Sequence, residues 1–421
     1  MSPSVDVVVV GAGQAGLAAS YSLSLDRVHH LVLEAGEIGN SWRMHRWDSF
    51  HLNTPNWSNG LPGMEFHPEE ADAFATGNEL VRYFEEYVSN FHLPIMPRTS
   101  VMSLRRTSNG RFALRTHSEE MQSGAVILAS GGMTRPRVPA LAQRLPDDLA
   151  VLSAGSYRNP AALPKGAVLV VGSGQSGCQI TEDLLESGRE VYLSVGKVAR
   201  VPRSYRGRDI VAWWKDMGFW DVKPHELEDP SLQFAPQPQV SGTHGGHTVS
   251  LQSLARDGAV LVGRLLDADR RILKLDRNVR ESIRFADEKS RAFKAAIDVY
   301  IEREGIEAEE PLPDPGEPPI PDLGRSDEIA DFDLDRAGVS AVIWCIGFDA
   351  DWSWVEAGIF DQAGRPSHNN GVTALPGLYL LGTPWLSARK SGILMGVSDD
   401  AARVVQHIRA HALVDLNHTG T

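Results

Sequence analysis

Cysteine is almost absent from this sequence: it has two in 421 residues, Cys178 and Cys345. They form no C-x-x-C pair, which argues against the thiol–disulfide exchange that such pairs perform. Cys178 falls in the first turn of an expected helix and is interpreted as a small packing residue. We therefore expect a function that does not depend on a redox-active pair of thiols.

An excess of basic charge and long apolar runs are also missing. The formal net charge is −13, whereas nucleic-acid binding normally needs a basic surface. No apolar run reaches the roughly 20 residues of a membrane-spanning helix. Because the sequence passes from residues 1–3 almost directly into an expected strand, we also expect no signal peptide. These features predict a cytoplasmic protein without a nucleic-acid or membrane partner.

Two glycine motifs are the most informative feature that is present. Residues 11–16 read GAGQAG after a run of valines, and residues 172–177 read GSGQSG after a second apolar run. Each run is typical of a buried strand, and each motif opens a helical pattern. Such glycines allow a tight turn, close approach of the backbone to a pyrophosphate, and close packing of helix on strand. Two motifs in this setting predict two dinucleotides and favour electron transfer between them.

Strands alternate with helices around both motifs, which predicts an α/β fold. We expect two doubly wound Rossmann-like dinucleotide-binding domains, the second inserted into the first. The expected boundaries are 1–150 and 335–421 for the first domain and 160–334 for the second. The second domain carries a helical and proline-rich insertion over about 225–334.

The residue at the end of the second strand of each domain bears on the choice of coenzyme. Glu34 lies about 20 residues after the first motif, where a carboxylate accepts hydrogen bonds from ribose and repels a 2′-phosphate. The first domain is therefore expected to hold FAD or NAD. The corresponding strand of the second domain ends in Ser194, and cations follow it. The missing acid favours the 2′-phosphate of NADPH, with Lys197 or Arg203 beside Ser194 as its first-choice partners.

That cation run contains five residues: Lys197, Arg200, Arg203, Arg206 and Arg208. Two or three of them are expected to be solvated surface cations instead.

Two segments after Glu34 carry a resemblance to a known family. Residues 39–43 read GNSWR, and residues 47–55 read WDSFHLNTP. The chain resembles the class B flavoprotein monooxygenases, which include flavin-containing monooxygenases and the plant YUCCA-type enzymes. The resemblance implies FAD in the first domain and places Asn53, the catalytic candidate, beside the reactive edge of the flavin. Residues 390–396 resemble the family's closing segment, which aims the last helix at the pyrimidine end of the flavin.

The motifs and the resemblance together give the expected cofactor-binding residues. For FAD they are Gly11, Gly13, Gln14, Ala15, Gly16, Glu34, Trp42, Arg43, Ser391, Ile393 and Leu394. For NADPH they are Gly172, Gly174, Gln175, Ser176, Gly177, Ser194, Lys197 and Arg203.

The chain departs from the family pattern in two places. The F-x-G-x-x-x-H linker motif, aligned on Tyr157, is replaced by Asp147, Leu149 and Ser153. The A-T-G-Tyr/Phe signature keeps only its last two positions, in residues 345–348. These departures disfavour a Baeyer–Villiger reaction.

The resemblance implies a FAD- and NADPH-dependent monooxygenase that inserts one oxygen atom from O2 into a small organic substrate. The substrate would be nitrogen-, sulfur- or aromatic/indole-like, and the oxygen would pass through a C4a-peroxyflavin. Two alternatives stay open, an NADPH-dependent reductase or dehydrogenase without oxygen transfer and a redox sensor. A homodimer is also open.

Two further groups of side chains lie in the expected second domain. Trp213, Trp214, Phe219 and Trp220 are interpreted either as a roof over the substrate or as core packing, with packing favoured. His244 and His247 have no evident third ligand, so we expect no metal.

Overall fold

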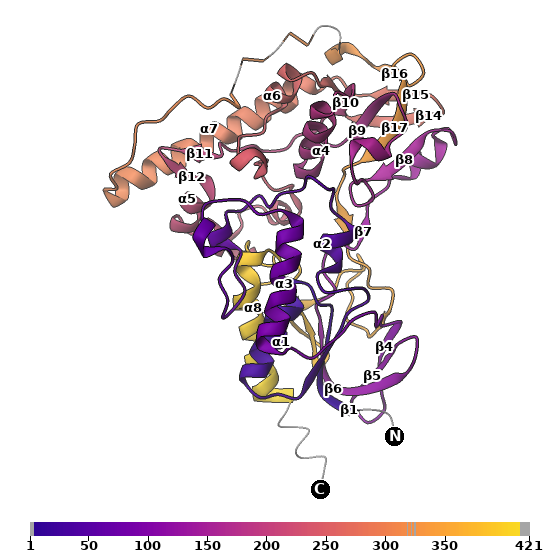
Figure 1. The fold of residues 1–421 in the computed structure, drawn as a ribbon, viewed down its shortest axis with the longest axis vertical. Helices are drawn as coiled ribbons and strands as arrows, with labels where there is room; N and C mark the ends of the chain where they lie inside the picture. The colour runs from indigo at the N-terminus through magenta and orange to yellow at the C-terminus, as the bar shows by residue number, and fades with distance from the viewer. Residues whose placement is uncertain (1–3, 318, 321, 324–325, 413–421) are drawn as a thin grey trace.

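The computed structural model describes residues 4–317, 319–320, 322–323 and 326–412. The chain forms two bodies, one above the other in Figure 1, each built on its own sheet. We call the body that holds the N-terminal strand the first unit and the body that holds the second glycine motif the second unit. Among the described residues, no helix is long and apolar enough to cross a bilayer.

The sheet of the first unit has ten strands, and its core is parallel. β1 (Ser4–Val10) lies between β2 (His30–Leu33) and β6 (Glu120–Leu128), and β22 (Leu378–Leu380) extends the sheet parallel to β6. The valines of β1 are buried on both faces, as expected for a central parallel strand. The other strands are β3 (Ile95–Met96), β4 (Ser103–Arg106), β5 (Phe112–Arg115), β19 (Val355–Glu356), β20 (His368–Asn369) and β21 (Val372–Thr373).

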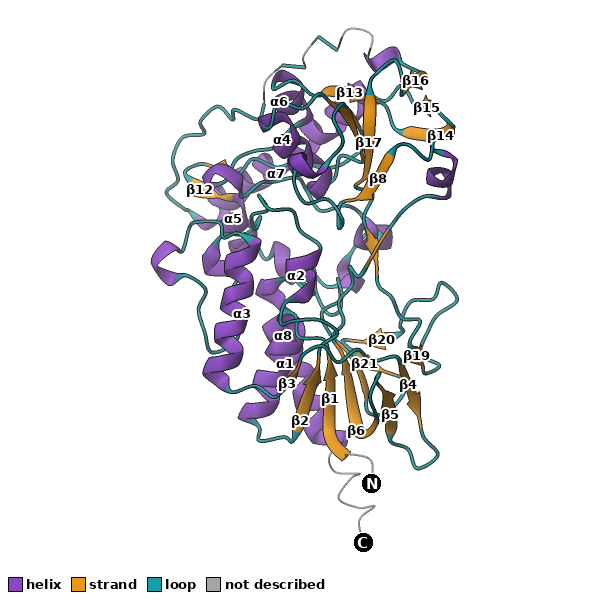
Figure 2. Cartoon of the chain, turned by 45° about the vertical axis from the view of Figure 1, so that its right-hand side comes forward, coloured by secondary structure: helices purple, strands orange, loops and turns teal. Residues whose placement is uncertain are grey.

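Helices α1 (Gln14–Leu25) and α8 (Leu394–His407) pack together beside this sheet (Figure 2), and α8 continues into a π-helical turn, Ile408–Ala412. The two remaining helices of the unit are α2 (Asn40–Met44) and α3 (Gly77–Phe91). A capping box fixes the start of α3, where Thr76 and Glu79 exchange hydrogen bonds.

The second unit has a five-stranded parallel sheet in the order β13-β10-β9-β17-β8. These strands are β8 (Ala150–Ser153), β9 (Ala167–Val171), β10 (Val191–Ser194), β13 (Val260–Val262) and β17 (Val339–Trp344). The helices are α4 (Gln175–Glu186), α5 (Ile210–Asp216), α6 (Leu251–Arg256) and α7 (Val279–Glu304). Small antiparallel sheets contain β11 (Ser204–Tyr205), β12 (Arg208–Asp209), β14 (Leu265–Asp269), β15 (Ile272–Leu275) and β16 (Asp331–Asp333).

The sheet order corrects the expected domain boundaries. The expected boundary at residue 335 puts β17 in the first domain, but β17 hydrogen-bonds between β9 and β8 in the second sheet. The second unit therefore begins by residue 150 and extends to residue 344. The physical reason is that a buried apolar strand has the same pattern in either sheet, so only its long-range pairing reveals which one it joins. Residues 318, 321, 324 and 325 of the expected proline-rich insertion lie outside the described residues.

Two crossing segments join the units, and they pair with each other. β7 (Arg135–Pro136) and β18 (Phe348–Asp349) form a two-stranded antiparallel ribbon between the bodies in Figure 1. Arg137 pairs with Asp349 at 2.8 Å beside it. We call this pair of strands the crossing ribbon.

Candidate active site

The two glycine loops have nearly the same geometry. Gly11 has φ +110°, and a Cβ there would lie 2.5 Å from the carbonyl oxygen of Ala129 at the end of β6. Gly172 has φ +105°, and a Cβ there would lie 2.6 Å from the carbonyl oxygen of Cys345 after β17. Both positions combine a left-handed backbone with a contact that leaves no room for a side chain.

The later glycines of each loop differ in what surrounds them. A Cβ at Gly16 or Gly177 would lie 1.8 Å from the carbonyl oxygen of the first glycine of its loop, so these residues allow helix and strand to pack. A Cβ at Gly13 or Gly174 would meet nothing within 4 Å. Each of the latter is the N-cap of its helix, and neither has a side-chain cap. Open space therefore lies where unpaired N–H groups of α1 and α4 can receive a phosphate.

Two hydroxyl groups test whether a dinucleotide fits the first unit. Ser130 follows β6 and Thr383 follows β22, and the buried hydroxyl oxygen of each makes no hydrogen bond to any residue that the structure describes. Both lie at the carboxyl ends of parallel strands, the edge where ligands of such sheets bind. Buried hydroxyls are normally paired, so these two fit a polar group that lies along this edge.

Glu34 is held at the end of β2 by the backbone around it. Its carboxylate accepts hydrogen bonds from the N–H of Ala12 at 2.7 Å and of Gly36 at 2.8 Å. The residue is only 8% exposed, yet each carboxylate oxygen has more than one acceptor position. Glu34 is thus fixed in a position where it can accept hydrogen bonds from ribose hydroxyls and would repel a 2′-phosphate.

Gln14 joins three of the expected FAD segments. Its side-chain oxygen accepts from the indole N–H of Trp42 at 2.9 Å, and its amide nitrogen donates to the carbonyl oxygen of Gly392 at 3.2 Å. Ala15 is buried in the first turn of α1, and a Cβ at Gly382 would lie 2.6 Å from its methyl group.

The structure does not place Arg43 beside Gln14 and Trp42. Its guanidinium pairs with Glu85 on α3 at 2.6 Å.

The expected FAD residues at the start of α8 have structural roles. Ser391 is buried, and its hydroxyl accepts from the backbone N–H groups of Ser387 and Ala388, so it stabilises the turn before α8. Ile393 is the N-cap of α8 and Leu394 is its first residue.

Arg46 is a residue that the sequence analysis missed. Its guanidinium lies 4.9 Å from the ring centroid of Trp42 and 5.3 Å from that of Phe50. Burial lowers the pKa of Arg46 to about 10. Arg46 lies in the bend beyond the end of α2 at Met44, so no helical spacing in the sequence predicts its contact with Trp42.

Asn53 lies where the two units meet. Its side-chain oxygen accepts from the amide nitrogen of Gln179 on α4 at 2.9 Å, and its backbone oxygen accepts from the guanidinium of Arg203 at 2.8 Å. Nearby, the Ser49 hydroxyl donates to Asp183 at 2.7 Å, one turn further along α4. We call this contact, residues 49–53 against residues 179–183, the seam.

The guanidinium of Arg203 faces the first unit instead of lying beside Ser194. It is buried, pairs with Asp209 at 2.6 Å, and stacks 4.7 Å from the ring centroid of Phe74. Because Asp209 matches its charge and one of its terminal nitrogens donates to the backbone oxygen of Asn53, Arg203 is not placed to bind the 2′-phosphate.

The other expected NADPH residues at the end of β10 are also largely engaged. The buried Ser194 hydroxyl donates to the carbonyl oxygen of Gly263 at 3.0 Å and accepts from the N–H of Leu265 at 3.1 Å. Lys197 pairs with Glu281 at 2.7 Å, and both side chains are more than half exposed. A pair so exposed is weak and exchanges readily with another anion. The remaining cations of the run have carboxylate partners: Arg200 with Asp287 and Glu317, Arg206 with Asp298, and Arg208 with Asp216.

Residues 239–241 lie against the second glycine loop. The Gln175 side chain exchanges hydrogen bonds with both backbone groups of Val240, and Gln239 donates to the carbonyl oxygen of Ser173. Ser176 is half-buried in the first turn of α4. The loop is therefore braced on one side and open at Gly174.

The expected aromatic cluster packs as a core that reaches the first unit. Trp214 stacks on Phe219 at 4.6 Å, and Trp220 contacts both rings edge-on. Trp57 and Ile393 pack against the larger hydrophobic core that contains Trp213, Trp214 and Trp220. It thus links the second unit to the segment that begins α8.

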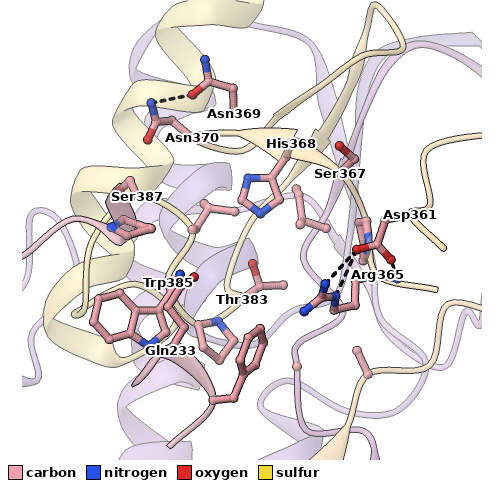
Figure 3. Close-up of a pocket in the computed structure, with 18 of the residues that line it drawn as sticks. Gln233, Asp361, Arg365, Ser367, His368, Asn369, Asn370, Thr383, Trp385 and Ser387 are labelled. Atoms are coloured by element: carbon pink, nitrogen blue, oxygen red, sulfur yellow. Dashed lines mark hydrogen bonds and ion pairs between the residues drawn. The ribbon is translucent and has the colours of Figure 1, made fainter. Parts of the chain in front are cut away.

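A cavity of about 1370 Å³ lies beside the carboxyl end of β22 (Figure 3). Gly132 and Phe348 line it from the two crossing segments, His368 from β20, and Thr383 from the loop after β22. It exceeds the roughly 300–1,000 Å³ of ordinary ligand pockets. Its charged lining residues are Arg137, Lys223, Arg365, Arg403, Asp349 and Asp361.

His244 and His247 have carboxylate partners, and both cysteines are buried. His247 pairs with Glu182 at 2.6 Å and His244 with Glu186 at 2.7 Å, and no group of three potential metal ligands occurs in the described part of the chain. Both cysteines are free and buried, and burial raises the pKa of each thiol.

Comparisons with known proteins agree with this architecture. Residues 8–213 match the family described as pyridine nucleotide-disulphide oxidoreductase. An uncharacterized CzcO-like oxidoreductase of Geobacillus kaustophilus is 31% identical over 410 residues, which cover 97% of this chain and 99% of that protein. A probable indole-3-pyruvate monooxygenase, YUCCA1 of Arabidopsis thaliana, is 30% identical over 205 residues, 48% of this chain and 49% of that protein. The solved flavin-containing monooxygenase of Stenotrophomonas maltophilia has a TM-score of 0.66 at 19% identity and covers 97% of this chain and 99% of its own.

Two sheets with parallel cores, each with a glycine loop that leaves the N-terminus of the next helix open, define an oxidoreductase built on two dinucleotide-binding units. The expected fold class, two Rossmann-like α/β units with one inserted into the other, is confirmed. The chain belongs to the family of the CzcO-like oxidoreductases, which it matches over nearly its full length. Over about half of its length it is also similar to plant indole-3-pyruvate monooxygenases.

Proposed function

We propose that this protein is a FAD- and NADPH-dependent monooxygenase that transfers one oxygen atom from O2 to a small organic substrate. The observation that carries the proposal is the meeting of the two glycine-loop units at Asn53, which is held by Gln179 of the second unit. A bound flavin would supply the redox chemistry, accepting hydride from the nicotinamide and then reacting with oxygen. The chain's own residues bind the two coenzymes, orient them and exclude water.

The first unit is proposed to hold FAD and the second NADPH. Glu34 would receive the ribose of FAD, the N–H groups after Gly13 its pyrophosphate, and Ser130 and Thr383 further polar groups along the same edge. Of the two expected cations, Lys197 and not Arg203 is the proposed ligand of the NADPH 2′-phosphate. It is exposed at the end of β10 and gives up only a weak surface pair with Glu281.

The substrate is proposed to approach through the cavity in Figure 3. This cavity adjoins the proposed FAD site of the first unit at Thr383, because the neighbouring Gly382 lies against Ala15 in the first turn of α1. Both crossing segments line it, so its shape depends on how the two units are set. Nitrogen-, sulfur- and aromatic/indole-like compounds are the proposed substrate class.

The test is a screen of NADPH consumption by the FAD-loaded protein against amines, sulfides, indoles and keto acids under ¹⁸O2. We expect at least one compound to stimulate NADPH consumption and to yield a product carrying one ¹⁸O atom. NADPH consumption that never labels a product, with all oxygen recovered as hydrogen peroxide, would refute oxygen transfer and leave a reductase.

A further inference from the structure

A buried acceptor without a partner lies at the seam. Gln179 is 3% exposed, and its amide nitrogen donates to the side-chain oxygen of Asn53 at 2.9 Å. Its own side-chain oxygen makes no hydrogen bond to any described residue. Buried amide oxygens are normally paired, because leaving one unpaired forfeits its hydration. The side chain is therefore half satisfied, with an acceptor available for a ligand.

The position of Gln179 indicates which ligand group its free oxygen would bind. Gln179 lies one turn after Gln175, the first residue of α4, and the N-terminus of that helix is the proposed pyrophosphate site of NADPH. On the other side it contacts Asn53, the residue proposed to lie beside the flavin. A nicotinamide that transfers hydride to the flavin must lie between these two places. Its carboxamide carries an NH2 group, which is the donor that the Gln179 oxygen lacks.

We propose that Gln179 is a positioning residue that binds the nicotinamide carboxamide through its oxygen and orients Asn53 through its nitrogen. With the Asn53 oxygen occupied by Gln179, the Asn53 amide nitrogen, which makes no hydrogen bond to any described residue, is the group left to face the flavin site. This inference rests on the proposed function, because the flavin and the nicotinamide define the two neighbours of Gln179.

The seam provides a matched control. Ser49 and Asp183 form a hydrogen bond of 2.7 Å between the same segments, one turn further along α4. Ser49→Ala removes one contact between the units without altering Gln179 or Asn53. A general loosening of the seam would therefore appear in Ser49→Ala as well as in Gln179→Leu.

The experiment compares binding of NADP⁺ with binding of its 3-acetylpyridine analogue, in which a methyl group replaces the carboxamide NH2. Titration calorimetry on the FAD-loaded protein measures both, and 2′,5′-ADP, which has no nicotinamide, checks folding. We expect the wild type and Ser49→Ala to prefer NADP⁺ by about tenfold, the loss of one buried hydrogen bond. Gln179→Leu should bind both about equally and keep its affinity for 2′,5′-ADP.

Gln179→Glu separates the two roles. Its carboxylate keeps the acceptor and loses the donor, so the preference for NADP⁺ should survive while the amount of product per NADPH consumed falls. A Gln179→Leu protein that retains the wild-type preference, or a wild type that binds both coenzymes equally, overturns the inference and leaves the proposed function standing. A wild type that binds neither coenzyme overturns both.

Discussion

Replacing Gly13 or Gly174 with alanine, which adds one methyl group, should weaken coenzyme binding without affecting folding. Each residue has an ordinary negative φ, −86° and −72°, and a Cβ at either position would meet no atom within 4 Å. Gly13→Ala should therefore fold normally and fail to hold FAD, whereas Gly174→Ala should hold FAD and bind NADPH weakly. The two variants test the two loops independently.

The free energy of unfolding should change little, because two effects of the alanine substitution oppose each other. Alanine in place of glycine reduces the entropy of the unfolded chain and stabilises by about 0.4–1 kcal/mol, but it is the poorer N-cap by a similar amount, about 0.5–1 kcal/mol. The free energy of unfolding should change by less than about 0.5 kcal/mol, or roughly 2 °C in the melting temperature. In the complex, the methyl group occupies the open space at the helix N-terminus. Losing one charge-assisted hydrogen bond of about 1.5–3 kcal/mol there weakens binding by roughly 10- to 150-fold.

The assay measures FAD per protein after gel filtration, the dissociation constant of FAD for the apoprotein, and that of NADP⁺ for the FAD-loaded protein. Gly358→Ala is the control, because a Cβ there also meets nothing within 4 Å and the residue lies away from both loops. The reasoning is refuted if Gly13→Ala retains FAD with wild-type affinity, or if either loop variant loses stability together with binding.

Three further outcomes are expected. Lys197→Ala should raise the KM for NADPH by about tenfold and leave that for NADH unchanged, in steady-state kinetics with both coenzymes; equal effects would remove Lys197 from the 2′-phosphate site. Ser367→Trp, which fills part of the cavity in Figure 3, should raise the KM for the substrate and leave NADPH binding unchanged, whereas an unaltered KM would place the substrate elsewhere. Burial lowers the pKa of His247, but the Glu182 carboxylate outweighs it and the pKa is raised overall. The stability that His247 contributes is thus complete below its ordinary pKa of 6.5 and is lost as pH rises through the raised value. His247→Gln should flatten the urea-unfolding profile above pH 6.5, and an unchanged profile would contradict the assignment.

Local features of the sequence predicted much of the fold. The valine run before Gly11 and the helix after it follow from patterns within about 20 residues, and the structure places them as β1 and α1. The position of β17 could not be predicted in this way, because its membership of the second sheet depends on pairing with β9, far away in the sequence.

The same distinction between local patterns and long-range contacts applies to the candidate site. The acid at Glu34 and the open glycine at Gly13 follow from spacing within one strand–helix unit. The direction of Arg203 does not, because the chain after β10 turns toward the first unit and matches the charge with Asp209. The contact of Asn53 with Gln179 joins residues 126 positions apart, and no local pattern announces it.

The crossing ribbon constrains how the two halves of the molecule move. A pair of hydrogen-bonded strands bends across its thin dimension more easily than it shears, because shearing would break the bonds from the Arg137 N–H to the Gly347 oxygen and from the Thr134 N–H to the Asp349 oxygen. The two units should consequently move relative to each other by a hinge rotation about one axis at the crossing ribbon. Such rotation would part residues 49–53 from α4 to admit a coenzyme and then return both grooves to the same alignment.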